Sequence, residues 1–186
     1  MDKKNTKVIT GECVLSYLNC WEPKGYEGSE PKYSVSLVID KKDTKTINAI
    51  KEAIRNAYDN GKQIMGNVSF ERMKNNPLRD GDEERADDPV YAGKYFVNAS
   101  SKNQPGIVDR YRQEILDRGE MYSGVIGRAA INFYAFNKAG NNGVGCGLLN
   151  LQKLRDGQPL DGHSKAENDF DDGYGESLGA DESCLD

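Results

Sequence analysis

The chain has 186 residues, of which 37% are hydrophobic and 30% are charged, as expected for one compact globular domain with a core of its own. No stretch approaches the roughly 18 consecutive apolar residues that a membrane-spanning helix needs. The lysine-containing start has no apolar segment behind it, so we expect neither a membrane anchor nor a signal peptide.

The charge is unevenly distributed along the chain. Eight of the 30 acidic residues lie in residues 166–186, which contain no Lys or Arg, so residues 1–165 carry 22 acids against 25 Lys and Arg and a net charge of about +3. We therefore predict a mildly basic folded domain over residues 1–165 and a disordered acidic tail over residues 166–186. Six further acids lie in residues 79–88 (RDGDEERADD), which we expect to form a solvated loop.

The first third of the chain predicts two strands and a helix. Residues 7–21 and 32–40 are typical of strands, and the turn-rich residues 22–31 separate them. In the second strand, apolar side chains alternate with Ser34 and Ser36, the pattern of a half-buried strand. Residues 43–61 predict an amphipathic helix that Asp43 or Thr44 caps and Gly61 ends.

The remainder predicts further strands with insertions. We expect an extended connection over residues 66–93, a strand over 93–102, a short helix over 105–119, and a long hairpin over 122–154 that turns at residues 137–143. Strands dominate and do not alternate with helices as in a parallel sheet. A mainly β protein built as a small antiparallel barrel, with helices inserted, is the natural closed solution.

Two strands combine an apolar face with a face of mixed character. In residues 94–102, Tyr95, Val97 and Ala99 share one face; in residues 125–138, alternate small and apolar residues do the same. The opposite faces mix aromatic rings, cations and amides: Lys94, Phe96, Asn98, Ser100 and Lys102 on the first strand, and Ile126, Arg128, Ala130, Asn132, Tyr134, Phe136 and Lys138 on the second.

This mixture suits single-stranded nucleic acid, because aromatic rings stack on bases of any identity while cations follow the phosphates. We predict that rings stack on bases at Phe96, Tyr134 and Phe136, that cations neutralise phosphates at Lys94, Lys102, Arg128 and Lys138, and that amides contribute hydrogen bonds at Asn98 and Asn132. The alternative is that these rings pack across strands within the core. Trp21 and Tyr17 either extend the stacking surface or cap the core.

Catalysis and metal binding receive little support from the sequence. His163 is the only histidine, and the four cysteines (Cys13, Cys20, Cys146 and Cys184) are far apart with no C-x-x-C pair. Most Ser-His and Cys-His schemes are thereby excluded, and free thiols suit a reducing cytoplasm. We expect a non-catalytic cytoplasmic protein without a metal or cofactor.

Five blocks, in order, resemble a family of phage single-stranded DNA-binding proteins. They are PLRDGDEE, YFVNASSKNQPGIVD, YSGVIGRAAINFYAFN, GNNGVGCGLLNLQKLRDGQPL and the acidic ENDFDD, and the resemblance runs from about residue 7 to residue 172. It implies an oligonucleotide-binding (OB) fold with long insertions and a role in phage replication or recombination. It also implies that the sheet face with Phe96, Arg128, Tyr134 and Phe136 meets DNA, in the cytoplasm of the infected host.

The acidic tail predicts a second function. A flexible polyanion tethered to a basic groove has a high local concentration there, so we expect it to compete with DNA, to recruit replication or recombination proteins, or to aid solubility. The residues expected to take part are Asp169, Phe170, Asp171, Asp172 and Tyr174. An exposed strand edge is a possible site of homodimer formation. A protein-interaction module without a DNA role, or an RNA-binding protein, are the alternatives.

Overall fold

The computed structural model describes residues 2–160. The expected domain boundary at residue 165 and the acidic tail therefore lie outside the described residues. Within them, no helix is long and apolar enough to cross a membrane.

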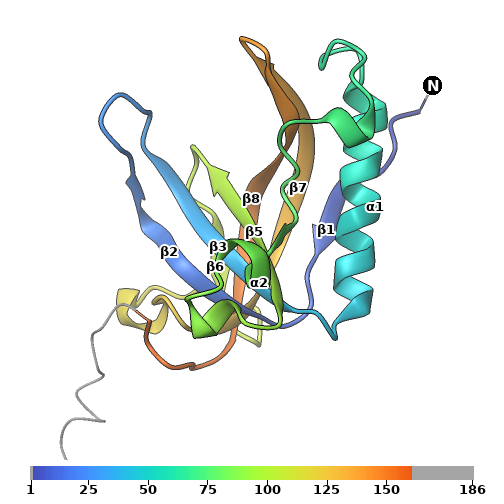
Figure 1. Cartoon of the computed structure of the whole chain (residues 1–186). Helices are drawn as coiled ribbons and strands as arrows, with labels where there is room; N and C mark the ends of the chain where they lie inside the picture. Colours follow the sequence, from blue (N-terminus) through green and yellow to red (C-terminus); the bar gives the residue numbers. More distant parts are fainter. Residues whose placement is uncertain (1, 161–186) are drawn as a thin grey trace, which may run out of the picture.

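The core of the structure is a closed barrel of five strands (Figure 1). β2 pairs antiparallel with both β3 and β7, β3 pairs with β5, β7 pairs with β8, and a parallel contact between Ser100 of β5 and Gly147 of β8 completes the ring. This is the five-stranded topology of the OB fold, as expected. The five strands are β2 (Cys13–Lys24), β3 (Lys32–Asp40), β5 (Lys94–Ser101), β7 (Ile126–Lys138) and β8 (Asn141–Arg155).

The alternation predicted for β7 is confirmed. On β7 the small and apolar set from Gly127 to Phe133 is buried, while Arg128, Asn132 and Tyr134 lie on the other face. The half-buried pattern predicted for β3 is wrong from Val35 to Ile39, where all five residues are buried, because Tyr91 packs over the outer face at Ser36 and Val38. The bounds of β3 are those predicted, and the long hairpin turns between β7 and β8 as expected.

α1 (Thr44–Gly61) covers one side of the barrel, next to β7 and the short strand β1 (Lys7–Ile9) (Figure 1). The Asp43 carboxylate caps the helix by accepting from the backbone N–H of Thr46, and the apolar stripe that includes Ile47, Ile50 and Ile54 is buried. The predicted first strand is divided into β1 and β2, because the chain turns at Gly11, whose N–H donates to Thr46 Oγ1 at 2.9 Å.

Residues 79–93, which we call the cover, fold over one half of the outer face of β3 and β5. They comprise β4 (Arg79–Asp80), α2 (Gly81–Glu84) and the 3-10 turn η2 (Pro89–Tyr91), and follow η1 (Phe70–Arg72). Tyr91 is fully buried and forms a second small core with Val38 and Phe96. The expected solvated acidic loop is confirmed only in part: four of the six acids are exposed, but the segment contains α2, and several of the acids cap turns or bind cations.

The cover is fastened at several points. Tyr91 Oη is hydrogen-bonded to both Ser16 Oγ and Ser36 Oγ, each at 3.2 Å, and the Asp82 carboxylate accepts from the Gly93 N–H. Lys41 Nζ lies 2.8 Å from carboxylate oxygens of both Asp80 and Asp82.

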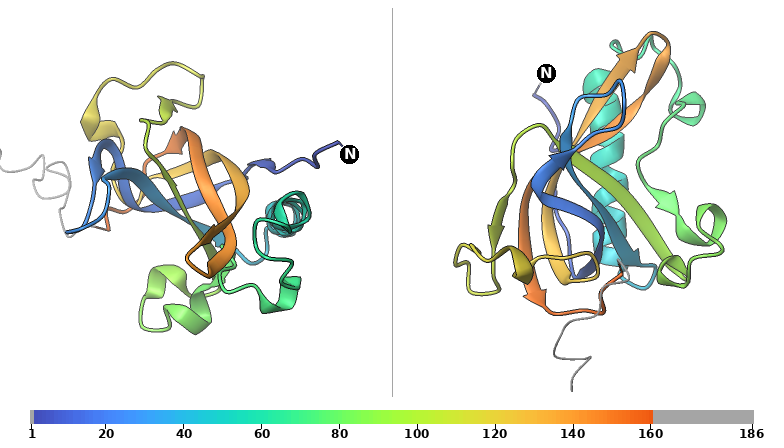
Figure 2. Two further views of the ribbon diagram at one scale, coloured as in Figure 1. Left: turned by 90° about the horizontal axis from the view of Figure 1, so that it is seen from above. Right: turned by 90° about the vertical axis from the view of Figure 1, so that its left-hand side faces the viewer.

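The helix predicted over residues 105–119 is not formed. Residues 106–108 instead form β6 (Gly106–Val108), which runs parallel to β8, with Ile107 buried opposite Leu151. The Asp109 carboxylate then accepts from the N–H groups of Tyr111 and Gln113, a local turn that competes with helix formation. A 3-10 turn, η3 (Arg118–Glu120), follows. Figure 2 shows this connection on the side of the barrel opposite the cover.

Candidate nucleic-acid interface

Two hairpins, which we call the arms, extend from the same end of the barrel, with β5 between them (Figure 1). One arm is the β2–β3 hairpin and the other is the β7–β8 hairpin. In OB folds, the corresponding loops and the sheet face between them are where oligonucleotides bind. Two hollows, of about 540 and 350 Å³, lie on this part of the surface, and Asn98 of β5 lines both. We refer to the two hollows together as the groove.

The smaller hollow lies against the β2–β3 arm. Its floor is polar and carries Ser34, Ser36, Asn98 and Ser100, all from the outer faces of β3 and β5. Its sides carry a second set of residues, which are aromatic or cationic: Tyr17, Lys24, Tyr26 and Arg85. Tyr17 and Tyr26 are 57% and 80% exposed, so both rings present flat apolar faces to solvent, as stacking on a base requires.

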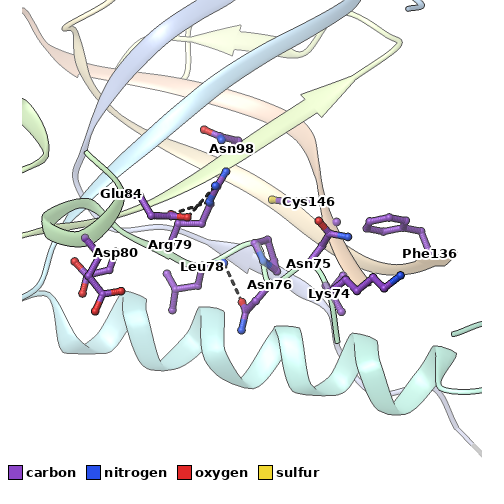
Figure 3. A pocket seen from close by; sticks show the side chains of 14 residues that line it. Lys74, Asn75, Asn76, Leu78, Arg79, Asp80, Glu84, Asn98, Phe136 and Cys146 are labelled. Carbon is purple, nitrogen blue, oxygen red and sulfur yellow. Dashed lines mark hydrogen bonds and ion pairs between the residues drawn. The ribbon is translucent and has the colours of Figure 1, made fainter. Parts of the chain in front are cut away.

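The larger hollow lies between the β7–β8 arm and residues 74–80, which bridge the opening between β8 and β5 (Figure 3). Asn75 holds one end of the bridge, where its side-chain amide donates to the Asn142 carbonyl at 2.8 Å. At the other end, Arg79 of β4 pairs with Phe96 of β5. Lys74 donates to the Gly140 carbonyl at the tip of the arm, so a cation lies near Phe136 (Figure 3).

The β7–β8 arm carries two rings on its outer face. The ring centroids of Tyr134 and Phe136 are 6.5 Å apart, and Phe136 lines the larger hollow. The Tyr134 ring lies over Gly145 of β8, which leaves no room for a side chain there: a Cβ would approach the ring to 2.7 Å. Partial burial raises the pKa of the Tyr134 hydroxyl, so the ring remains a neutral phenol.

The acids of the groove are concentrated at its α2 end. Glu84 accepts from Arg79 through both carboxylate oxygens, at 2.8 and 2.9 Å, and Asp80 is paired with Lys41. Glu83 has no ion-pair partner within residues 2–160. These three acids line only the larger hollow, and because carboxylates repel phosphate, that side of the larger hollow is better suited to bases than to the backbone of a nucleic acid.

Comparison with known proteins identifies a family. Residues 6–181 match the family described as Enterobacter phage Enc34, ssDNA-binding protein. The chain belongs to this family. A similar protein is putative protein p50 of Acyrthosiphon pisum secondary endosymbiont phage 1. The two chains are 32% identical over an alignment that covers 89% of this chain and 93% of p50.

Members of the Enc34 family and a more distant phage protein share the fold. The C-terminally truncated single-stranded DNA-binding protein of bacteriophage Enc34 superposes with a TM-score of 0.70 at 22% identity, over 83% of this chain and 88% of that one. The same Enc34 protein in complex with ssDNA gives 0.67 at 23% identity, over 83% and 89%. The single-stranded DNA-binding protein gp2.5 of bacteriophage T7 gives 0.60 at 13% identity, over 87% and 98%.

One predicted stacking residue of this family member is not available for stacking. Phe96 lies on the expected face of β5 but is 1% exposed, because the cover lies over it. The Tyr91 ring meets it edge-on, with centroids 5.1 Å apart, and the guanidinium carbons of Arg79 and Arg85 lie 5.6 and 5.7 Å from its centroid. The expectation that Phe96 stacks on DNA is therefore wrong for this structure.

The other predicted residues fall into three groups. Asn98 and Phe136 line the groove, and Tyr134 lies beside it. Lys138 is exposed at the tip of one arm; Lys102 pairs with Glu30 of the connection between β2 and β3. The remaining four line neither hollow and have intramolecular partners: Lys94 with Asp40, Arg128 with the Thr10 carbonyl, Asn132 with Thr6 Oγ1, and Trp21 with the Arg118 and Met121 carbonyls.

Several groove residues were missed from the sequence. Lys24 ends β2 and Tyr26 follows it in the connection to β3, Lys74 comes from the bridge, and Arg85 comes from the acidic cover. The two tyrosines of the smaller hollow follow no strand alternation, since Tyr17 lies at a register shift and Tyr26 in a turn. An exposed aromatic in a turn was the one signal available for Tyr26.

No cluster of three or more His, Cys, Asp or Glu side chains suited to a metal ion occurs in residues 2–160. Cys146 lines the larger hollow. However, burial raises the pKa of its thiol far above the usual value, which disfavours the nucleophilic thiolate.

Proposed function

We propose that this chain is a non-catalytic protein that binds single-stranded DNA in the groove, without a marked sequence preference, during phage DNA replication or recombination in the cytoplasm of the infected host. The observation that carries the proposal is the groove itself, which has the exposed rings of Tyr17 and Tyr26 on one arm, the partly buried ring of Phe136 on the other, and a polar floor between them. Base–aromatic stacking contributes roughly 1–3 kcal/mol per base and is tolerant of sequence. The Enc34 protein in complex with ssDNA, which has the same fold, supports this assignment.

Single strands are favoured over duplex because stacking on a side chain requires a base face that duplex DNA does not expose. The rings of Tyr26 and Phe136 lie on opposite arms, so a strand that crosses the floor can stack on both. Lys24 and Lys74 stand near the two ends of this path and are suited to phosphate. The serines and Asn98 between them can hydrogen-bond to backbone or base without selecting a sequence.

The test is the binding of a fluorescent oligo-dT and of a matched duplex across a salt series. We expect tight binding to the single strand, weak binding to the duplex, and a log–log salt dependence whose slope is about −0.7 for each phosphate neutralised. Phe136→Ala is expected to weaken binding roughly 5- to 150-fold, the equivalent of one lost stack, with Tyr111→Ala as a control at an exposed ring outside the groove. Absence of binding by the wild-type chain would favour the protein-interaction module instead.

We propose further that the acidic tail competes with DNA for the groove. Leu160, the last described residue, donates its N–H to the Ser123 carbonyl and lines a small hollow together with Tyr17, so the described chain ends next to a residue of the groove. Because the tail is tethered there, we expect its eight acids to have a high effective concentration at the cationic side chains of the groove. A version that ends at Lys165 is expected to bind oligo-dT more tightly at low salt; unchanged affinity would refute the competition.

Recruitment of replication or recombination proteins by the tail, with Phe170 and Tyr174 as apolar anchors, is the complementary proposal. DNA that displaces the tail from the groove would make it available to such a partner. Homodimerisation also stays a prediction; the sheet path ends at β1 and β6, which are the edges that a second copy would meet. Sedimentation with and without oligo-dT tests the oligomeric state, and a matched oligo-rU tests RNA binding.

A further inference from the structure

We infer that Tyr17 and Arg85 together form a binding unit for one nucleotide: the Tyr17 ring stacks on the base, and the Arg85 guanidinium binds the adjacent phosphate. This inference rests on the proposed function, since it assigns the residues that hold one position of the bound strand. The two residues come from distant parts of the chain, β2 and the cover, and meet on one side of the smaller hollow.

The backbone at Tyr17 is strained. Its φ is +47°, a left-handed conformation that residues other than Gly, Asn and Asp rarely adopt. It lies in the register shift of β2 between Ser16 and Asn19, where a bulge redirects a side chain. Such strain persists where the surroundings impose it, and it is frequent at ligand sites.

Contacts on both sides hold the strained residue in place. On the preceding side, Ser16 Oγ accepts from the buried Tyr91 hydroxyl. On the following side, the Leu18 N–H donates to Ser123 Oγ at 2.9 Å. The result is a tyrosine that is 57% exposed and lines the groove. An exposed ring contributes little to the core, so packing does not explain why the chain adopts this conformation.

Arg85 is suited to an anion although it belongs to the most acidic segment of the described chain. Its guanidinium carbon lies 5.5 Å from the centroids of both Tyr17 and Tyr91 and 5.7 Å from that of Phe96. No carboxylate in residues 2–160 forms an ion pair with it. A guanidinium that contacts aromatic faces keeps its edge N–H groups available for phosphate.

Four of the six neighbouring acids are engaged elsewhere, and the other two, Glu83 and Asp87, are exposed and form no ion pair with Arg85. Asp80 and Asp82 bind Lys41, and Glu84 binds Arg79. The Asp88 carboxylate accepts from the Val90 N–H. The Arg85 backbone is also fixed: its N–H donates to the Gly81 carbonyl at 2.9 Å, and its carbonyl accepts from the Asp88 N–H at 3.0 Å.

A nucleotide fits this arrangement better than a simple anion or an apolar group. The ring and the guanidinium lie next to the hydroxyl and amide groups of Ser34, Ser36 and Asn98 in the same hollow. An exposed aromatic face, a cation beside it and a polar floor match the base, the phosphate and the sugar of one unstacked residue of a single strand.

The two side chains are expected to give different signatures in oligo-dT binding. Tyr17→Ala should weaken binding roughly 5- to 150-fold and leave the salt slope unchanged, because no phosphate contact is lost. Arg85→Ala should weaken binding and make the slope shallower by about 0.7, the loss of one phosphate contact. The double variant should lose less than the product of the two single effects, since each residue positions the nucleotide for the other.

A matched control pair exists outside the groove. The guanidinium carbon of Arg110 lies 5.3 Å from the centroid of the exposed Tyr111 ring, and neither residue lines either hollow. Arg110→Ala should leave the salt slope of oligo-dT binding close to that of the wild-type chain.

Thermal unfolding provides a second readout, which concerns the backbone at Tyr17. Tyr17→Gly should unfold at a higher temperature than Tyr17→Ala, because Gly accepts a positive φ without strain. Both variants should bind DNA weakly.

The outcomes separate the two proposals. If the wild-type chain does not bind oligo-dT, the proposed function fails. If it binds but Arg85→Ala keeps the wild-type slope, or Tyr17→Ala keeps the wild-type affinity while folded, the assignment of this nucleotide unit is overturned and the groove remains.

Discussion

Replacing Phe96 by Ala tests whether the cover, rather than DNA, occupies this part of the sheet face. The side chain is 1% exposed and packs against Tyr91 and Val38. Deleting a buried Phe costs about 3–5 kcal/mol of unfolding free energy, and we expect about 3 because the cover can partly collapse into the space. For a chain of this size, 1 kcal/mol lowers the melting temperature by about 2–4 °C, so the expected decrease is about 6–12 °C.

The assay combines urea unfolding, thermal unfolding and oligo-dT binding at a temperature where the variant is folded. Phe136→Ala is the matched comparison, since its partly buried ring lines the groove and should affect binding far more than stability. Two results together would contradict the burial of Phe96 under the cover. Phe96→Ala would have the stability of the wild-type chain within about 0.5 kcal/mol, the range of ordinary surface substitutions, and it would lose DNA binding. That combination would make Phe96 a stacking residue on an open face.

Two further predictions concern the cover and the β7–β8 arm. Lys41 lowers the pKa values of both Asp80 and Asp82 below their ordinary 3.8. Their contribution to stability should therefore be present above that pH and lost as the pH falls through the folded-state pKa values. Between pH 7 and pH 2, the melting temperature of Asp82→Asn should decrease less than that of the wild type. Gly145→Ala should displace the Tyr134 ring and weaken oligo-dT binding. Gly147→Ala should do neither, because a Cβ at Gly147 stays 3.5 Å or more from its neighbours. Equal affinity of the two variants for oligo-dT would contradict the placement of the Tyr134 ring over Gly145.

Strand alternation predicted the parts of the fold that depend on local sequence. A side chain's face on β3 or β7 depends on its position in the strand, so the buried set from Gly127 to Phe133 followed from a period of two. The Asp43 cap and the apolar stripe of α1 are equally local. The helix expected over residues 105–119 failed because two turn-forming bonds of Asp109 and pairing with β8 outweighed helical propensity.

The groove was less predictable because it depends on contacts between distant residues. Alternation correctly assigned Phe96 to the outer face of β5, yet it cannot show that Tyr91 returns to cover that face through hydrogen bonds to Ser16 and Ser36, 75 and 55 positions away. Arg85 was overlooked for a related reason. In the sequence it stands among six acids, and only the folded cover separates its guanidinium from their carboxylates.

The placement of acids beside a proposed DNA groove has a physical explanation in these same contacts. Asp80 and Asp82 share the single cation Lys41, and Glu84 pairs with Arg79, so these ion pairs offset part of the negative charge of the cover. What the acids stabilise is the fold of a segment that buries Phe96 and holds Arg85 beside Tyr17. Four of the six acids therefore keep the cover in place through ion pairs or a turn cap, and Arg85, which forms no ion pair within residues 2–160, lines the groove beside Tyr17.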